Sequence, residues 1–168
     1  YRGDRLTLDV DIDQKSSVHL TTQANTVVHH TRAGKAYQST NLRIGASSYC
    51  EYLPDPLILL AGADMNSSTR VVVEPSATLV LAESFATHDP KGRDNPFKNF
   101  KSELCIEISN GELLAVDRFE INGSTFLSGN VAMQGGQLNQ GSMLVVAPGN
   151  LSSVVNELRS IIESISCI

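Results

Sequence analysis

Three acidic residues stand beside apolar runs, where an ionised side chain is energetically unfavourable. Asp4 precedes the apolar pattern that starts at Leu6, Glu83 follows the run 79–82, and Asp117 follows the run 113–116. An ionised carboxylate among apolar side chains is costly unless water or a partner meets it. These residues are therefore candidates for a polar site, and hydrogen-bonded acids at strand edges are the alternative.

The histidines offer little metal chemistry. His29 and His30 are adjacent on an expected strand, so their side chains would point to opposite faces and would not share a metal ion. His88 lies beside Asp89 in the longest irregular stretch, 87–100, where an imidazole next to a carboxylate could contact an ion or a partner. We keep His88 as a metal candidate, with an ordinary surface loop as the alternative.

Signatures of covalent and nucleotide chemistry are missing from the sequence. It contains no G-x-S-x-G nucleophile elbow, no P-loop and no G-x-G-x-x-G. Cys50, Cys105 and Cys167 are odd in number and form no C-x-x-C pair, so neither a disulfide framework nor a zinc site is expected. We therefore expect a protein that is not an enzyme and has no tightly bound cofactor.

The composition excludes several classes of partner. A net charge of -5 and a pI near 5.3 do not fit a nucleic-acid-binding protein, which needs an excess of basic residues. The apolar runs, such as Leu57 to Ala61, are far shorter than the roughly 20 residues that a membrane span needs. Unpaired cysteines fit a reducing compartment, so we expect a cytoplasmic protein.

Short apolar or β-branched runs separated by turn residues dominate the chain. Apolar residues alternate with polar or acidic ones from Leu6 to Ile12, which predicts a strand with one apolar and one acidic face. Asn110-Gly111 predicts a hairpin, because both turn positions accept positive φ. Further strands are expected around 18–20, 26–28, 42–44, 57–60, 71–73, 79–81, 104–108, 113–116, 119–121 and 144–146. Many closely spaced short strands predict a mainly β body, either a sandwich or a β-solenoid.

One amphipathic helix is expected near the C-terminal end. Apolar residues recur at three- and four-residue steps from Leu151 to Ile165, and Asn150 is the expected N-cap. The chain length of 168 residues fits one domain, with a β body over about 1–147 and the helix over about 151–166. Because the sequence starts without methionine, we expect it to be part of a longer protein.

Three stretches, in order, carry a resemblance to a known family. The first joins Gly3-Asp4-Arg5-Leu6 to Thr21-Thr22-Gln23-Ala24, and the second is Glu51-Tyr52-Leu53-Pro54-Asp55-Pro56-Leu57-Ile58. The third starts at Ala77 to Glu83, continues at Gly92-Arg93 and ends at Leu113-Leu114 with Asp117-Arg118. Together they resemble the UreD (also called UreH) family of urease accessory proteins, with its G-D-x-L, T-T-Q-A, E-Y-L-P-x-P-x-I and L-L-x-x-D-R patterns. One departure is the stretch Asp94 to Phe97, where the family has G-E-x-F.

The resemblance implies a β-helix-like scaffold, or chaperone, for inserting nickel into apo-urease. Its implied partners are a UreF-like protein, a UreG-like GTPase held through UreF, and apo-urease, in an assembly that could be dimeric. Nickel in transit would pass through an internal tunnel, guided by Asp4, Glu83 and Asp117, since weak oxygen ligands suit an ion that must be released. The other family-like positions are Thr21, Thr22, Gln23, Glu51, Pro54, Asp55, Pro56, Gly92, Arg93 and Arg118.

Two rival functions remain open. A carbohydrate-active β-solenoid enzyme would use Asp55 with Glu51 or Glu83 as its acid and base. Only 5% of residues are aromatic and none is Trp, which disfavours a sugar site, because sugar faces usually stack on aromatic rings. A purely structural β interaction domain would explain the fold but not the ordered motifs.

Overall fold

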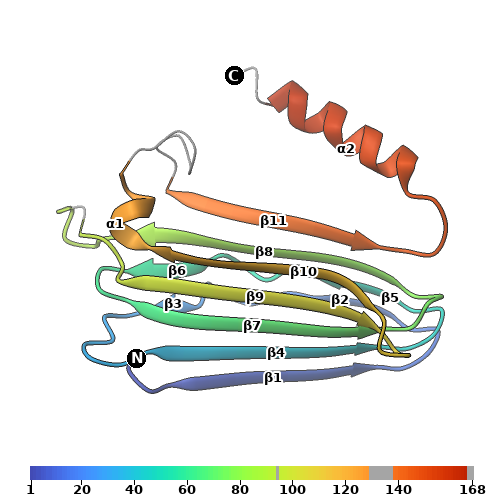
Figure 1. Cartoon of the computed structure of the whole chain (residues 1–168), viewed down its shortest axis with the longest axis horizontal. Coiled ribbons are helices and arrows are strands. Elements are labelled where there is room, and N and C mark those ends of the chain that lie inside the picture. The colour runs from blue at the N-terminus through green and yellow to red at the C-terminus, as the bar shows by residue number, and fades with distance from the viewer. Residues whose placement is uncertain (94, 129–137, 166–168) are drawn as a thin grey trace.

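Two β-sheets face each other across an apolar interior (Figure 1). The structure is a computed structural model, and it describes residues 1–93, 95–128 and 138–165. Sheet A has the strand order β1-β4-β7-β9-β10, and sheet B has the order β2-β5-β8-β6-β3, with β11 also paired to β8. The strands are β1 Arg5–Ile12, β2 Ser17–Leu20, β3 Val27–Val28, β4 Ala36–Ile44, β5 Tyr49–Tyr52, β6 Leu57–Leu60, β7 Asp64–Val73, β8 Thr78–His88, β9 Asn99–Ile108, β10 Leu113–Asn122 and β11 Asn139–Val146. The helices are α1 Gly123–Phe126 and α2 Ser152–Ile165.

The strands wind as a β-solenoid. Of the two architectures expected from the sequence, the β-solenoid is therefore confirmed and the sandwich is wrong. Each of the first two coils places one long strand in sheet A and two short strands in sheet B, namely β1, β2, β3 and then β4, β5, β6. In the third coil β7 is followed by β8, which pairs with β5 through its first half and with β6 through its second. Neighbouring long strands pair in parallel at offsets of about thirty residues, as in Arg5↔Tyr37 and Ala36↔Met65. Segments that are far apart in the sequence therefore lie side by side.

The alternating pattern of the first strand is confirmed. Ile12 is buried in the core, while Asp9 and Asp11 extend from the opposite face of β1. There Asn41 Nδ2 donates a hydrogen bond to Asp9 Oδ1 at 2.7 Å, and Arg43 pairs with Asp11 at 3.1 Å. Side chains at matching positions of successive coils thus form polar ladders on the outer face of sheet A.

The predicted hairpin is also confirmed, but its turn differs from the expected two-residue type. Strands β9 and β10 pair antiparallel, and the four residues 109–112 connect them. Gly111 has φ +91° whereas Asn110 does not have positive φ. Instead, the Asn110 side-chain oxygen accepts the Glu112 N–H at 2.9 Å, which stabilises the longer turn.

The apolar interior is divided into two clusters. One contains Leu42, Val71, Leu79 and Ile106, whereas the other contains Leu59 and Met65 together with four buried phenylalanines. Between the clusters, the inward positions of sheet A become polar. These polar residues are Gln38, Thr40, Ser67, Thr69, Ser102 and Asp117. This polar belt crosses four of the five strands and positions the site described below.

The C-terminal helix forms where the sequence predicts it, although residue 166 lies outside the described residues. The Asn150 side-chain oxygen accepts the Ser152 N–H at 2.8 Å, which satisfies a free amide at the start of α2. The apolar stripe is exposed, with Leu158 at 37% and Ile162 at 62%, and α2 stands apart from the sheets in Figure 1. Within the described part of the chain, no helix is long and apolar enough to cross a membrane.

Candidate functional site

Sheet B is interrupted at the same level in the first two coils. Residues 21–26 separate β2 from β3, and residues 53–56 separate β5 from β6. The two bends are stacked by side-chain hydrogen bonds: the Thr21 hydroxyl donates to the Leu53 carbonyl at 2.8 Å, and the Asp55 N–H donates to the Thr22 hydroxyl at 2.9 Å. The T-T-Q-A and L-P-D-P segments are therefore neighbours, although about thirty residues separate them in the sequence.

Two prolines help to explain why sheet B breaks here. Pro54 and Pro56 flank Asp55, and a proline has no N–H to donate to a strand ladder. In the third coil β8 continues through this level. The register Leu20↔Tyr52↔Leu81 then places Glu83 level with the two bends.

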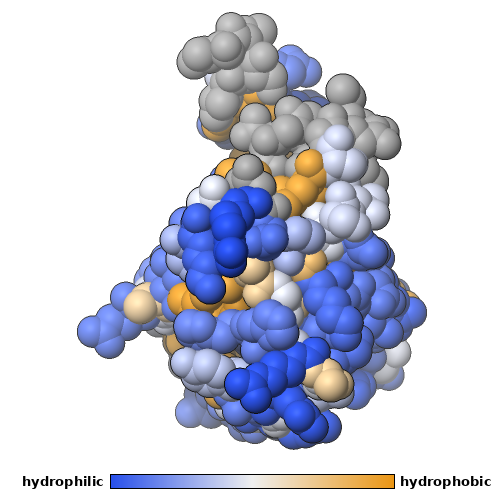
Figure 2. All heavy atoms as spheres, turned by 90° about the vertical axis from the view of Figure 1, so that its left-hand side faces the viewer, coloured by the Kyte–Doolittle hydropathy of each residue, from blue (hydrophilic) through white to orange (hydrophobic). Residues whose placement is uncertain are grey.

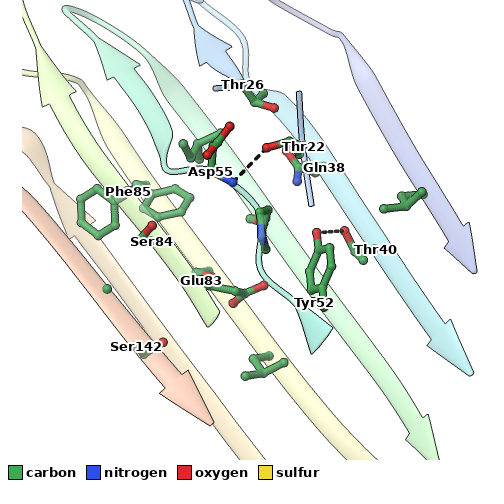
Figure 3. A pocket seen from close by; sticks show the side chains of 18 of the residues that line it. Thr22, Thr26, Gln38, Thr40, Tyr52, Asp55, Glu83, Ser84, Phe85 and Ser142 are labelled. Atoms are coloured by element: carbon green, nitrogen blue, oxygen red, sulfur yellow. Dashed lines mark hydrogen bonds between the residues drawn. The ribbon is translucent and has the colours of Figure 1, made fainter. Parts of the chain in front are cut away.

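A cavity of about 250 Å³ lies between the sheets at this level (Figure 3). All five strands of sheet A contribute to its lining, and so do both bends, β8 and β11 of sheet B. The cavity therefore extends across all the coils, along the solenoid axis. Its polar lining is rich in hydroxyl and amide groups, including those of Thr22, Gln38, Thr40, Ser67, Ser102 and Ser142.

Glu83 is the half-buried carboxyl group of this cavity. Figure 3 shows Glu83 and Tyr52 pointing into the same space. The Thr69 hydroxyl donates a hydrogen bond to Glu83 Oε1. Burial raises the pKa of Glu83, the Thr69 hydrogen bond partly offsets this, and the charge of Asp117 raises the pKa further. Burial is also the largest cause of the raised pKa of Tyr52, whose hydroxyl lies 3.5 Å from the Thr40 hydroxyl.

Two further carboxylates join Glu83 in the lining. Asp117 lies on β10 opposite Leu104 of β9, at an inward position between Ala115 and Phe119, which pack against the two apolar clusters. Asp55 lies on the second bend. The described residues contain no group of three or more His, Cys, Asp or Glu side chains close enough to hold a metal ion together. Asp55, Glu83 and Asp117 therefore line the cavity without forming such a cluster.

Asp4, the third acid of the candidate group, lies elsewhere. It precedes β1 and is exposed, with its carboxylate 2.7 Å from the amino group of Tyr1, and it is not among the described residues that line the cavity. The structure therefore brings Glu83 and Asp117 together and adds Asp55 in place of Asp4.

The remaining family-like positions divide between the cavity and the surface. Thr22, Pro54 and Asp55 line the cavity, while Gln23 is exposed on the first bend. Pro56 follows in the second bend, and its carbonyl accepts a hydrogen bond from Asn25. Thr21 stacks the two bends, as described above.

Glu51 and Arg118 lie outside the cavity. The Glu51 carboxylate accepts a hydrogen bond from Tyr49 and contacts His19 Nδ1 at 2.8 Å, and these contacts lower its pKa. Because Glu51 is occupied with these neighbours, the geometry does not support its pairing with Asp55 as an acid and base. Arg118 pairs with Glu103 at 3.0 Å on the outer face of sheet A.

The histidine expectations need correction. His29 and His30 follow β3 instead of lying on a strand: His29 stacks on Tyr1, and His30 Nδ1 accepts the Arg32 N–H. His88 is exposed at the end of β8, so the irregular stretch is shorter than expected and runs from residue 89 to 98. The Asp89 carboxylate is occupied by its own loop rather than by His88, since it accepts hydrogen bonds from the N–H groups of Lys91, Arg93 and Asn95.

The raised pKa of Glu83 predicts a pH-dependent stability difference. The pKa of the Glu83 carboxyl group is higher in the folded than in the unfolded state. The folded protein therefore loses stability as the pH rises from below the ordinary pKa of 4.5 through the raised pKa. Glu83→Gln removes this loss, so the variant should gain stability relative to the wild type between pH 4 and pH 8 in urea unfolding. Glu103→Gln, on the outer face, should show no such gain. A Glu83→Gln difference that is constant with pH would contradict the assignment.

The polar belt is the main feature that the sequence did not reveal. Gln38, Thr40, Ser67 and Thr69 occupy inward positions of strands whose other inward residues are apolar. The signal is present in the sequence as polar residues recurring at the coil spacing, as in Thr40↔Thr69 and Ser67↔Ser102. This recurrence of polar residues can be recognised only when the number of residues in one coil is known.

The fold and the cavity together define a class, namely a β-solenoid with a cavity between its two sheets. The family model described as UreD urease accessory protein matches residues 1–166. The chain belongs to the UreD family of urease accessory proteins. This confirms the resemblance seen in the sequence.

Curated relatives of the chain are named urease accessory protein UreD. Over its whole length the chain is 37% identical to urease accessory protein UreD 1 of Methylorubrum populi and 35% identical to that of Methylorubrum extorquens. It is 36% identical over 71% of its length to urease accessory protein UreD 2 of Streptomyces griseus. The chain spans 57% of the length of the two Methylorubrum proteins and 41% of the Streptomyces protein.

Proposed function

We propose that this chain is a non-enzymatic scaffold of urease maturation whose internal cavity guides nickel towards apo-urease. The observation that carries the proposal is the cavity itself, which every strand of sheet A helps to line and which contains Glu83 and Asp117. Membership of the UreD family supports the accessory role. Asp55 is the third carboxylate of the proposed path, and Asp4 lies outside this cavity.

The chemistry of the cavity supports passage more than storage. Hydroxyl, amide and carboxylate oxygens form weak, exchangeable bonds with a divalent cation, whereas a closed thiolate site would retain it. Burial and Asp117 raise the pKa of Glu83, so a proton competes with the cation for this carboxylate. A cation that reaches Glu83 displaces the proton, and reprotonation favours its release.

The proposed partners are a UreF-like protein, a UreG-like GTPase bound through UreF, and apo-urease. The names of the relatives, which are urease accessory proteins, support a role beside urease. We also propose a cytoplasmic location, one structural domain comprising the solenoid and α2, and two copies within the assembly. Nucleotide hydrolysis would come from the GTPase, because the sequence contains no P-loop.

Co-purification tests the scaffold role. The tagged chain is expressed together with UreF-like and UreG-like proteins, and we expect a stable ternary complex that survives gel filtration. Failure to retain any UreF-like protein would refute the bridging role. Release of reducing sugar from polysaccharides by the isolated chain would instead support the carbohydrate-active alternative.

A further inference from the structure

One end of the solenoid is a continuous surface built from loops. Four segments meet there, on the left of Figure 1, namely 1–4, 31–35, 61–63 and 89–98, of which residue 94 lies outside the described residues. Backbone hydrogen bonds join them in sequence: Gly3 N–H to the Lys35 carbonyl at 2.8 Å, Thr31 N–H to the Gly62 carbonyl at 3.3 Å, and Gly62 N–H to the Pro96 carbonyl at 2.9 Å. We call this surface the loop end. Its loops are held together by the fold and need little ordering on binding.

The loop end has an excess of basic residues. It contains six of the thirteen Lys and Arg residues, namely Arg2, Arg32, Lys35, Lys91, Arg93 and Lys98. The sequence of these segments, with the adjoining Asp64, contains four acids, namely Asp4, Asp64, Asp89 and Asp94. Figure 2 faces this end and shows strongly hydrophilic side chains protruding from it. The local excess is opposite in sign to the net charge of -5 of the whole chain.

The acids described at the loop end are occupied by neighbours: Asp64 is paired with two lysines, Asp89 accepts hydrogen bonds from its own loop, and the exposed Asp4 is paired with the amino group of Tyr1. Asp64 is buried, with its carboxylate 2.7 Å from Lys98 Nζ and 3.3 Å from Lys35 Nζ. Asp89 accepts hydrogen bonds from the N–H groups of Lys91, Asn95 and Arg93 and from the Asn95 side chain, and these bonds lower its pKa to about 2. It therefore stays ionised and keeps the loop closed near neutral pH.

Lys91 and Arg93 are exposed on the loop end. Their backbone N–H groups face the Asp89 carboxylate, and both residues are exposed. Among the described residues, no carboxylate forms an ion pair with Lys91, Arg93, Arg2 or Arg32. Arg2, Arg32, Lys91 and Arg93 are all exposed, so a partner can reach them.

We propose that the loop end binds an acidic segment of a partner protein. Complementary charge accelerates such an encounter and fixes its orientation, and arginine forms bidentate contacts with carboxylates. The observations favour a protein over a nucleic acid, because the chain as a whole is acidic and would repel a long polyanion beyond the loop end. This surface is separate from the cavity, so the proposal does not depend on nickel passage.

A labelled poly-L-glutamate peptide of about 20 residues tests the proposal by fluorescence anisotropy with the full chain, at low and at high salt. We expect binding at low salt that weakens as salt is added, and a loss of about tenfold in affinity for Lys91→Glu with Arg93→Glu. The matched control is Lys15→Glu with Arg159→Glu, which changes the net charge equally, away from the loop end. The control should change the affinity by less than about twofold.

Three results would overturn the proposal. The first is that the peptide does not bind at low salt. The second is that the loop-end and control variants lose the same affinity for the peptide. The third is that single-stranded DNA of the same charge binds as tightly as the peptide and depends equally on Lys91 and Arg93. The last result would identify a nucleic-acid surface instead. Circular dichroism of each variant checks that the comparison is made between folded proteins.

Discussion

Glu83→Gln combined with Asp117→Asn should lower urease activation by about tenfold or more when nickel is limiting. Both changes preserve size and remove charge, so the cavity keeps its shape but loses two of its three carboxylates. A loss of about 1.4 kcal/mol in the attraction for a divalent cation corresponds to a factor of ten. The measurement is urease activity per urease protein in cells that express the variant with its partners.

A matched pair of substitutions separates the cavity from general loss of charge. Glu103→Gln with Asp11→Asn removes one Glu and one Asp from the outer face of sheet A, where they pair with Arg118 and Arg43. Exposed pairs of this kind contribute little to stability, so activation should remain within about twofold of the wild type. Equal activation by the cavity variant and the wild type, with both complexes intact, would show that Glu83 and Asp117 are structural.

Phe85→Ala should cause the largest loss of stability, about 3–5 kcal/mol in the free energy of unfolding. All five phenylalanines of the chain form one cluster, and the Phe85 ring has its centroid within 6.3 Å of each of the others. Removing this ring leaves a hole beside the cavity and deprives four rings of a partner. Urea unfolding followed by circular dichroism measures the change.

Leu113→Ala is the control for this substitution, since Leu113 is 56% exposed on β10 and its truncation should cost less than about 1 kcal/mol. The loss in free energy of unfolding for Phe85→Leu should lie between the losses for Phe85→Ala and Leu113→Ala. A cost for Phe85→Ala as small as that for Leu113→Ala would mean that the cluster does not hold the sheets together.

Local patterns in the sequence were sufficient to predict the elements with a clear period. The alternation from Leu6 to Ile12 and the three- and four-residue steps after Asn150 each predicted an element that the structure contains. Short-range turn chemistry predicted the hairpin at Asn110-Gly111. These signals are local, because they depend on neighbours along the chain and not on the packing of distant segments.

The cavity could not be predicted in the same way, because its residues meet only through the winding of the coils. The sequence marked Asp55 only as a family-like position and as an acid of the rival enzyme, whereas the stacking of its bend on Thr22 makes it part of the lining. Asp4 looked equivalent to Glu83 in sequence, yet it lies before the first strand. Family patterns identified Glu83 and Asp117, but only the register of the sheets shows that they face the same space.

Anomalous X-ray diffraction at the nickel edge, on crystals soaked in nickel, tests the central claim most directly. At a pH where Glu83 is ionised, we expect an anomalous peak in the cavity beside Glu83 or Asp117, and no such peak in Glu83→Gln with Asp117→Asn. Nickel only at exposed histidines such as His88, with an empty cavity in the wild type, would contradict the proposal that the cavity conducts the ion.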